Sequence, residues 1–125
     1  MSMFMIAAMV QPFRIEQVRS ELLSSGIQGL TATLCCGHGR QPRLVDTFWG
    51  EGKIPELLDK IKIEVAVVDA DVDAAVDAIV RGARLGAIGD GKIFISEIEH
   101  AVSINNGAKD ELALHPRREF IEAAE

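Results

Sequence analysis

Residues 85–95 read LGAIGDGKIFI and place three glycines and a lysine between a helical pattern and a strand pattern. Gly89 and Gly91 allow positive φ angles and a close approach of the main chain to a ligand, and Lys92 can bring its charge to a phosphate. Asp90 can brace the turn or hold a ribose hydroxyl. The spacing matches neither the Walker loop nor the dinucleotide fingerprint. By itself, the GDGK motif therefore indicates a tight turn more readily than a phosphate site.

The composition indicates one globular domain, because the chain has 125 residues, of which 48% are apolar and 26% charged. A net charge of −6 argues against binding to long nucleic acids, but leaves a single nucleotide possible. The apolar start, MSMFMIAAMV, is too short to span a bilayer and lacks the basic region of a signal peptide. Cys35 and Cys36 are adjacent and form no disulfide framework. We expect a cytoplasmic protein with no membrane insertion.

Hydrophobic periodicity predicts alternating strands and helices. Residues 61–67 alternate with period two, which is typical of a strand with one buried face. Helices are expected over residues 14–25 and from Asp71, as N-cap, to about Arg84. Their apolar stripes are Ile15, Val18, Leu22 and Leu23 in the first and Val72, Val76, Ile79 and Ala83 in the second. Further strands are expected at residues 4–10, 27–36 and 93–104.

The order strand, helix, strand, strand, helix, strand predicts a ferredoxin-like α+β fold with an antiparallel four-stranded sheet. Both helices then lie on one face of the sheet. The other face is left uncovered, so we expect an oligomer in which such faces pack together. The pattern does not determine the number of subunits.

A long segment over about residues 38–58 separates the second and third predicted strands. Long loops in small domains are commonly functional or disordered, and aromatic and arginine side chains form contact hot spots. One interpretation is a flexible insertion without a binding function. We favour the other interpretation, a flexible loop that docks on a partner through Arg43, Phe48 and Trp49. We assign residues 1–108 to the domain and residues 109–125 to a C-terminal tail, either loose or a short helix.

The chain resembles the PII signal-transduction proteins over nearly its whole length. The matching stretches, in the same order and with the same loop length, are VQPF at 10–13, GIQGLTAT at 26–33, GHGRQ at 37–41, KIKIE at 60–64 and IGDGKIF at 88–94. The resemblance implies a homotrimer with its sheets facing inward and a nucleotide in each cleft between subunits. It also implies a long mobile loop that docks on a membrane transporter or an enzyme, and a regulatory protein that is not itself an enzyme.

The resemblance also implies roles for individual residues. Lys60 would pair with a carboxylate of 2-oxoglutarate, and Gln41 would help to hold Mg²⁺ together with ATP. A lysine at a cleft suits a small dianion, and an amide oxygen suits Mg²⁺ that keeps phosphate and water ligands. No other metal site and no cofactor are expected. The implied nucleotide-binding residues are Thr31, Gly39, Arg40, Glu64, Gly89, Asp90, Gly91 and Lys92.

The chain departs from the family at other positions. Two phosphate-binding arginines of the family align with Ser103 and Asn105. Each such contact is typically worth about 1.5–3 kcal/mol, so their absence favours ADP or AMP over ATP. The tyrosine that some members uridylylate aligns with Lys53, and the chain has no tyrosine. We therefore interpret the chain as a PII-like sensor of ADP or AMP, with a small anion such as bicarbonate near Lys60 and Arg40, in carbon-related regulation.

Two alternatives stay open and one is disfavoured. The first is a nitrogen-regulatory PII that senses ATP, Mg²⁺ and 2-oxoglutarate. The second is a CutA-like trimer that binds divalent cations through Cys35, Cys36 and His38, although strand alternation puts the two thiols on opposite faces and CutA-like proteins lack the GDGK loop. The acidic residues between 69 and 73 suit a helix start better than general acid–base catalysis, so we do not expect an enzyme.

Overall fold

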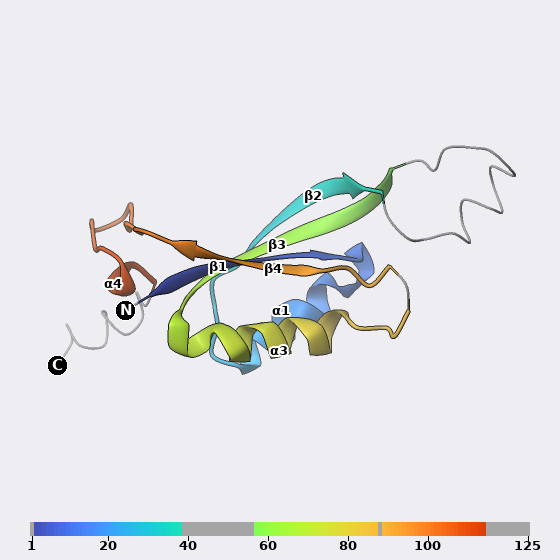
Figure 1. Ribbon diagram of the computed structural model, residues 1–125, viewed down its shortest axis with the longest axis horizontal. Helices are drawn as coiled ribbons and strands as arrows, with labels where there is room; N and C mark the ends of the chain where they lie inside the picture. The colour runs from blue at the N-terminus through green and yellow to red at the C-terminus, as the bar shows by residue number, and fades with distance from the viewer. Residues whose placement is uncertain (1, 39–56, 88, 115–125) are drawn as a thin grey trace, which may run out of the picture.

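The computed structural model describes residues 2–38, 57–87 and 89–114 (Figure 1). Its elements follow the predicted order of strands and helices, with a short 3-10 turn before each of the two long helices. They are β1 (Met3–Val10), η1 (Pro12–Arg14), α1 (Ile15–Ser24), β2 (Thr31–Gly37), β3 (Leu58–Val68), η2 (Asp69–Asp71), α3 (Val72–Ala83), β4 (Ile93–Ile98) and α4 (Glu111–Leu114).

The strands form one antiparallel sheet in the order β2-β3-β1-β4. β1 is central, with Ile6 opposite both Val65 of β3 and Ile95 of β4. Figure 1 shows α1 and α3 side by side on one face of this sheet. The predicted ferredoxin-like α+β fold is therefore confirmed.

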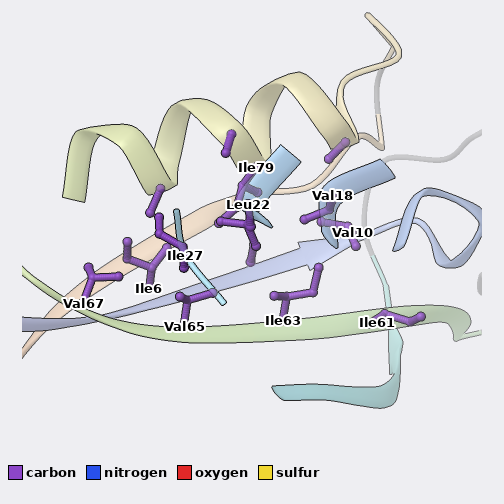
Figure 2. Close-up of a cluster of buried hydrophobic side chains, with 14 residues drawn as sticks. Ile6, Val10, Val18, Leu22, Ile27, Ile61, Ile63, Val65, Val67 and Ile79 are labelled. Carbon is purple, nitrogen blue, oxygen red and sulfur yellow. The ribbon is translucent and has the colours of Figure 1, made fainter. Parts of the chain in front are cut away.

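The core lies between the sheet and the two long helices (Figure 2). The period-two pattern of residues 61–67 is confirmed, because its alternate residues Ile61, Ile63, Val65 and Val67 are buried. α1 contributes Val18 and Leu22, and α3 contributes Ile79. Burial of each side chain of this size is worth about 1.5–3 kcal/mol, so this cluster supplies much of the stability of the fold.

The buried side of each helix differs in detail from the predicted stripe. In α3 the buried residues are mostly small ones, and Val72 and Val76 are only partly buried at the margin of the core. A Cβ atom added to Gly82 would lie 2.6 Å from Cα of Val18, so the two helices approach closely there. Leu23, which was part of the predicted stripe of α1, is 54% exposed and is not a core residue.

The ends of two predicted strands and the capping role of one residue are corrected. β2 begins at Thr31 and not at residue 27. β4 ends at Ile98 and not at residue 104, because the chain then turns back on itself: the N–H of Ser103 donates to the carbonyl of Ala108 at 2.8 Å. Asp71 lies at the N-cap of α3, but its side chain makes no capping hydrogen bond.

The sheet face opposite α1 and α3 carries polar side chains together with exposed apolar ones. Phe94 pairs with Ala7 on this side and is 56% exposed. The small helix α4 packs against β3 at one end of the face. Among the described residues, no helix combines the length and the apolar character needed to cross a membrane.

Candidate functional site

The glycine loop between α3 and β4 is held in shape by the Asp90 side chain. Its Oδ2 atom accepts hydrogen bonds from three backbone N–H groups, those of Leu85 at 3.0 Å, Gly86 at 2.9 Å and Ala87 at 3.3 Å. Of the two roles expected for Asp90, the structure places the carboxylate in the bracing role. The carboxylate therefore ties Asp90 to the backbone of residues 85–87.

The same contacts determine the ionisation of Asp90. Desolvation acts to raise the pKa of Asp90, but the three N–H donors and the nearby charge of Arg84 outweigh it, so this pKa is lowered. The carboxylate is therefore ionised at neutral pH. Charged acceptors form stronger hydrogen bonds than neutral ones, which stabilises the closed turn.

The loop is also seated on the end of β1. Gly91 has a φ of 108°, and a Cβ atom at this position would collide with the carbonyl oxygen of Met9. The N–H of Met9 donates to the carbonyl of Lys92 at 3.1 Å, and Nε2 of Gln11 donates to the carbonyl of Gly89 at 2.8 Å. The backbone of the loop is thus fixed, whereas the Lys92 side chain is exposed.

Two other predicted site residues, Thr31 and Glu64, lie together on a different part of the molecule. They are direct partners in the pairing of β2 with β3. Both line an open cavity of about 560 Å³, whose apolar surface includes Met5, Ala66 and Leu114. The combination of an apolar lining with a hydroxyl and a carboxylate suits a flat, partly polar group such as a nucleoside.

In the part of the chain that the structure describes, these two groups line different cavities. Asp90, Gly91 and Lys92 line a smaller hollow of about 190 Å³ with parts of β1 and α3, and Thr31 and Glu64 are not part of it.

Lys60 lies on β3 at the root of the long loop, directly opposite Cys35 of β2. Desolvation lowers the pKa of the Lys60 ammonium, and the charge of Cys35 acts in the opposite direction. A Cβ atom at Gly37 would lie 3.2 Å from Cγ of Lys60, so the lysine stem passes over this glycine. The other predicted residues of this region, Gly39, Arg40, Gln41, Arg43, Phe48 and Trp49, lie outside the described residues.

The positions that replace the two family arginines lie in the turn after β4. Ser103 accepts a hydrogen bond from the N–H of Gly107 through its carbonyl, and Asn105 is exposed. Neither side chain carries a positive charge. Across the ranges that the structure describes, no three His, Cys, Asp or Glu side chains are grouped so that they could hold a metal ion.

Sequence reasoning missed two contributors to these sites. Gln11 has no assigned role in the sequence pattern, although its amide donates to the carbonyl of Gly89, 78 positions further along the chain. Arg84 was interpreted only as a helix end, although its charge acts on Asp90. A polar residue directly before a helix-starting proline is a weak signal, and no local pattern could have shown its distant partner.

Comparison with known proteins gives a consistent family assignment. The family described as "Nitrogen regulatory protein P-II" matches residues 3–108. The chain is 45% identical to a nitrogen regulatory protein P-II of Rhizobium etli over 90% of this chain and 100% of that protein. It is 40% identical to the nitrogen regulatory protein GlnK of Escherichia coli K12, with the same coverage.

A solved structure supports the same assignment. The structure of Arabidopsis thaliana PII bound to citrate has a TM-score of 0.74 and 31% identity, and the match covers 90% of this chain and 89% of that one. The names of these relatives describe regulatory proteins and favour the nitrogen-regulatory alternative over carbon-related sensing of ADP or AMP. The agreement of sequence, fold and glycine loop shows that this chain belongs to the family of P-II nitrogen regulatory proteins.

Proposed function

We propose that this protein is a nitrogen-regulatory signal transducer that binds an adenine nucleotide and reports it to a target protein. The glycine loop carries the proposal, because Asp90 holds it closed through three backbone N–H groups while the Lys92 side chain remains exposed. A loop that is braced by one of its own side chains loses less conformational entropy on binding than an unbraced loop. The exposed ammonium of Lys92 is the group we assign to the phosphates.

The nucleotide is proposed to bind between neighbouring chains of a trimer. The proposal is supported by the separate placement of the predicted residues, since Thr31 and Glu64 line one cavity of the described chain and Asp90 and Lys92 line another. In this arrangement the glycine loop of one subunit meets the Thr31–Glu64 pair of the next. The exposed Phe94 on the open sheet face supports association, since burying such a side chain is favourable.

A small carboxylate effector is proposed to bind at Lys60, with Gln41 and Mg²⁺ completing the site. The partly desolvated ammonium of Lys60 supports this role, because a charge that has lost part of its hydration gains more from an anion. The solved plant relative is bound to citrate, which is a small polycarboxylate. We propose 2-oxoglutarate as the effector of this chain.

The output is proposed to pass through the long loop. Nucleotide and effector would favour one conformer of the loop, and a transporter or enzyme in contact with the cytoplasm would bind that conformer through Arg43, Phe48 and Trp49. Removal of Phe48 and Trp49 by substitution with Ala should spare nucleotide binding and abolish binding to the target. Binding that survives both substitutions would contradict this role of the loop.

A second candidate is the sensing of ADP or AMP with a small anion such as bicarbonate. It rests on Ser103 and Asn105, which supply no cation where the family has two arginines. The exposed Lys109, which pairs with Val102 in the same turn, is close enough along the chain to replace part of that charge.

Titration calorimetry separates these functions. The purified protein would be titrated with AMP, ADP and ATP, each with and without Mg²⁺, 2-oxoglutarate or bicarbonate. Synergy between MgATP and 2-oxoglutarate supports the nitrogen-regulatory function. Tighter binding of ADP or AMP that is insensitive to 2-oxoglutarate supports the second candidate, and no binding of any nucleotide contradicts both.

The glycine loop has its own matched test. Lys92→Ala should weaken nucleotide binding by about tenfold or more, because a charge-assisted hydrogen bond is worth about 1.5–3 kcal/mol. Arg19→Ala removes the same charge from the exposed side of α1 and should leave the affinity unchanged. Equal affinities of the Lys92→Ala variant and the wild type would contradict the assignment.

A further inference from the structure

The cavity lined by Thr31 and Glu64 is acidic. Its charged lining residues are Glu64 and Asp71, and within the described ranges no lysine, arginine or histidine lines it. The nearest printed cation is Lys62, whose Nζ atom lies 3.8 Å from Oε1 of Glu64, and both side chains of this pair are partly exposed. Such a solvated pair contributes little. The cavity therefore presents negative charge beside its apolar lining.

The Asp71 carboxylate is available for a partner. Asp71 precedes α3 and is half-buried, but its side chain makes no capping hydrogen bond with the helix. The side chain that pairs best with a carboxylate is arginine, because its planar guanidinium can donate two parallel hydrogen bonds. The cavity is thus complementary to a segment that carries both arginine and apolar side chains.

The chain itself leaves the described structure at this cavity. Ala113 and Leu114 of α4 line it, and Leu114 is the last described residue. The start of α4 is fixed, because the N–H of Asp110 donates to the carbonyl of Ala101 at 2.7 Å and the N–H of Ala101 donates to Oδ1 of Asp110 at 3.1 Å. The residues that follow Leu114 therefore begin from an anchored position beside the cavity.

The sequence after Leu114 reads HPRREFIEAAE and lies outside the described residues. Arg117 and Arg118 come first, and the apolar Phe120 and Ile121 follow. The family match ends at residue 108, so these residues lie beyond it. An extended chain advances about 3.5 Å per residue, so Arg117 can lie about 10 Å from Leu114. A volume of 560 Å³ corresponds to a sphere roughly 10 Å across, so this segment is long enough to fill the cavity.

We propose that residues 115–121 are an autoinhibitory segment that occupies this cavity when no nucleotide is bound. Its two arginines pair with the two carboxylates, and Phe120 packs on the apolar lining. A nucleotide must displace the segment, because the nucleoside and the segment use the same space. The competition rests on the nucleotide-binding function proposed above, whereas the occupancy of the cavity does not.

A tethered segment needs little affinity of its own. A short flexible connection gives it an effective concentration in the millimolar range at the cavity. A segment with a dissociation constant of about 0.2 mM would then fill the cavity most of the time and would weaken nucleotide binding about fivefold.

The methyl group of Met5 reports occupancy without any nucleotide. Met5 lines the cavity, whereas Met9 lies outside it, beside the glycine loop. In the full-length protein with ¹³C-labelled methionine methyl groups, the double substitution Arg117→Glu/Arg118→Glu should shift the Met5 resonance and leave that of Met9 unchanged. An unchanged Met5 resonance would overturn the proposal. A Met5 resonance that depends on protein concentration would assign the cavity to a segment of a second molecule, and would overturn it as well.

Titration calorimetry measures the competition. The nucleotide-free Arg117→Glu/Arg118→Glu protein should bind ADP and ATP about fivefold more tightly than the wild type. The substitutions add negative charge, which by itself disfavours an anionic ligand, so a gain in affinity reports release of the segment. Arg19→Glu, on the exposed side of α1, is the matched control and should give no gain. Unchanged affinity would overturn the competition, and a loss of affinity would show that the arginines hold the phosphates, which would overturn it too.

A double-mutant cycle with Asp71→Asn tests the pairing. Asp71→Asn should raise nucleotide affinity in the wild-type background, because one arginine loses its partner, and should have a smaller effect in the Arg117→Glu/Arg118→Glu background. Equal effects in the two backgrounds would show that the carboxylate and the arginines act independently, and would overturn the pairing. If none of these proteins binds a nucleotide, the proposed function and the competition both fail, whereas the Met5 resonance still decides whether the segment occupies the cavity.

Discussion

Asp90→Asn should loosen the glycine loop without unfolding the domain. The wild-type carboxylate accepts three hydrogen bonds from the backbone N–H groups of residues 85–87, at 2.9–3.3 Å. The amide that replaces this carboxylate in the variant would keep one oxygen but lose the charge. Because the loop is open to water, which replaces part of each lost bond, we count about 0.5 kcal/mol for each, or about 1.5 kcal/mol in all.

Amide hydrogen exchange measures this change directly. A loss of about 1.5 kcal/mol in the local opening free energy makes exchange about tenfold faster at residues 85–87. Asp77→Asn, on the exposed side of α3, removes the same charge and should leave these amides unchanged. If exchange at residues 85–87 is equal in the wild type and in Asp90→Asn, the carboxylate does not brace the loop and the reasoning is refuted.

The same residue predicts a dependence on pH. The pKa of Asp90 is lowered in the folded protein, so its contribution is fully present above the unfolded value of about 4 and is lost as pH falls through the folded pKa. The exchange ratio between Asp90→Asn and the wild type should therefore be constant from about pH 7 to pH 5 and should approach one in stronger acid. A ratio that increases in acid would contradict the lowered pKa.

Three further substitutions test the packing and the effector site. Leu22→Ala should lower the free energy of unfolding, measured with urea, by about 2–5 kcal/mol, because the Leu22 side chain is fully buried. The control Leu23→Ala, on the exposed side of the same helix, should lower it little, and equal losses in the two variants would contradict the core assignment. Gly82→Ala should lower the free energy of unfolding by about 1–3 kcal/mol despite the better helix propensity of alanine, because the alanine Cβ would press on the backbone of α1. A stabilised variant would show that the two helices can move apart without cost. Gly37→Ala should displace the Lys60 stem by a few tenths of an ångström and weaken 2-oxoglutarate binding several-fold in calorimetry, with no loss of folding stability; unchanged affinity would remove Lys60 from the effector site.

The strand β3 shows what a sequence pattern predicts well. Its period-two alternation depends only on one face of the strand being buried, so the spacing predicted a half-buried strand, and the structure shows that Ile63 and Val65 lie on the buried face. The end of β4 could not be found in this way. Val102 and Ile104 continue the apolar run, but the chain leaves the sheet because backbone groups at Ala101 and Ser103 bond to residues further along the turn.

The sites show a similar limit. The position of Asp90 between two glycines predicted a structured loop. It did not distinguish between the two roles of Asp90, bracing the turn or binding a ribose hydroxyl, because both require an aspartate at this position. Only the direction of its carboxylate, toward the backbone of residues 85–87, distinguishes them. In α3 the apolar spacing predicted the helix but only part of its buried side, because the contact with α1 depends on the small size of Gly82, which a hydrophobic pattern does not take into account.

The end of β1 lies between the proposed nucleotide-binding loop and the strand that carries the proposed effector residue Lys60. On one edge of β1, the Met9 carbonyl lies against Gly91 of the glycine loop. On the other edge, Val10 pairs with Ile61, the neighbour of Lys60. Only two strand spacings, roughly 10 Å, separate the strands that carry the two proposed binding regions. Amide chemical shifts of Val10 and Ile61 on addition of nucleotide would report whether binding at the glycine loop perturbs β3 through β1. If both amide shifts change, nucleotide and effector binding are coupled through one rigid strand, and no large rearrangement of the domain is needed.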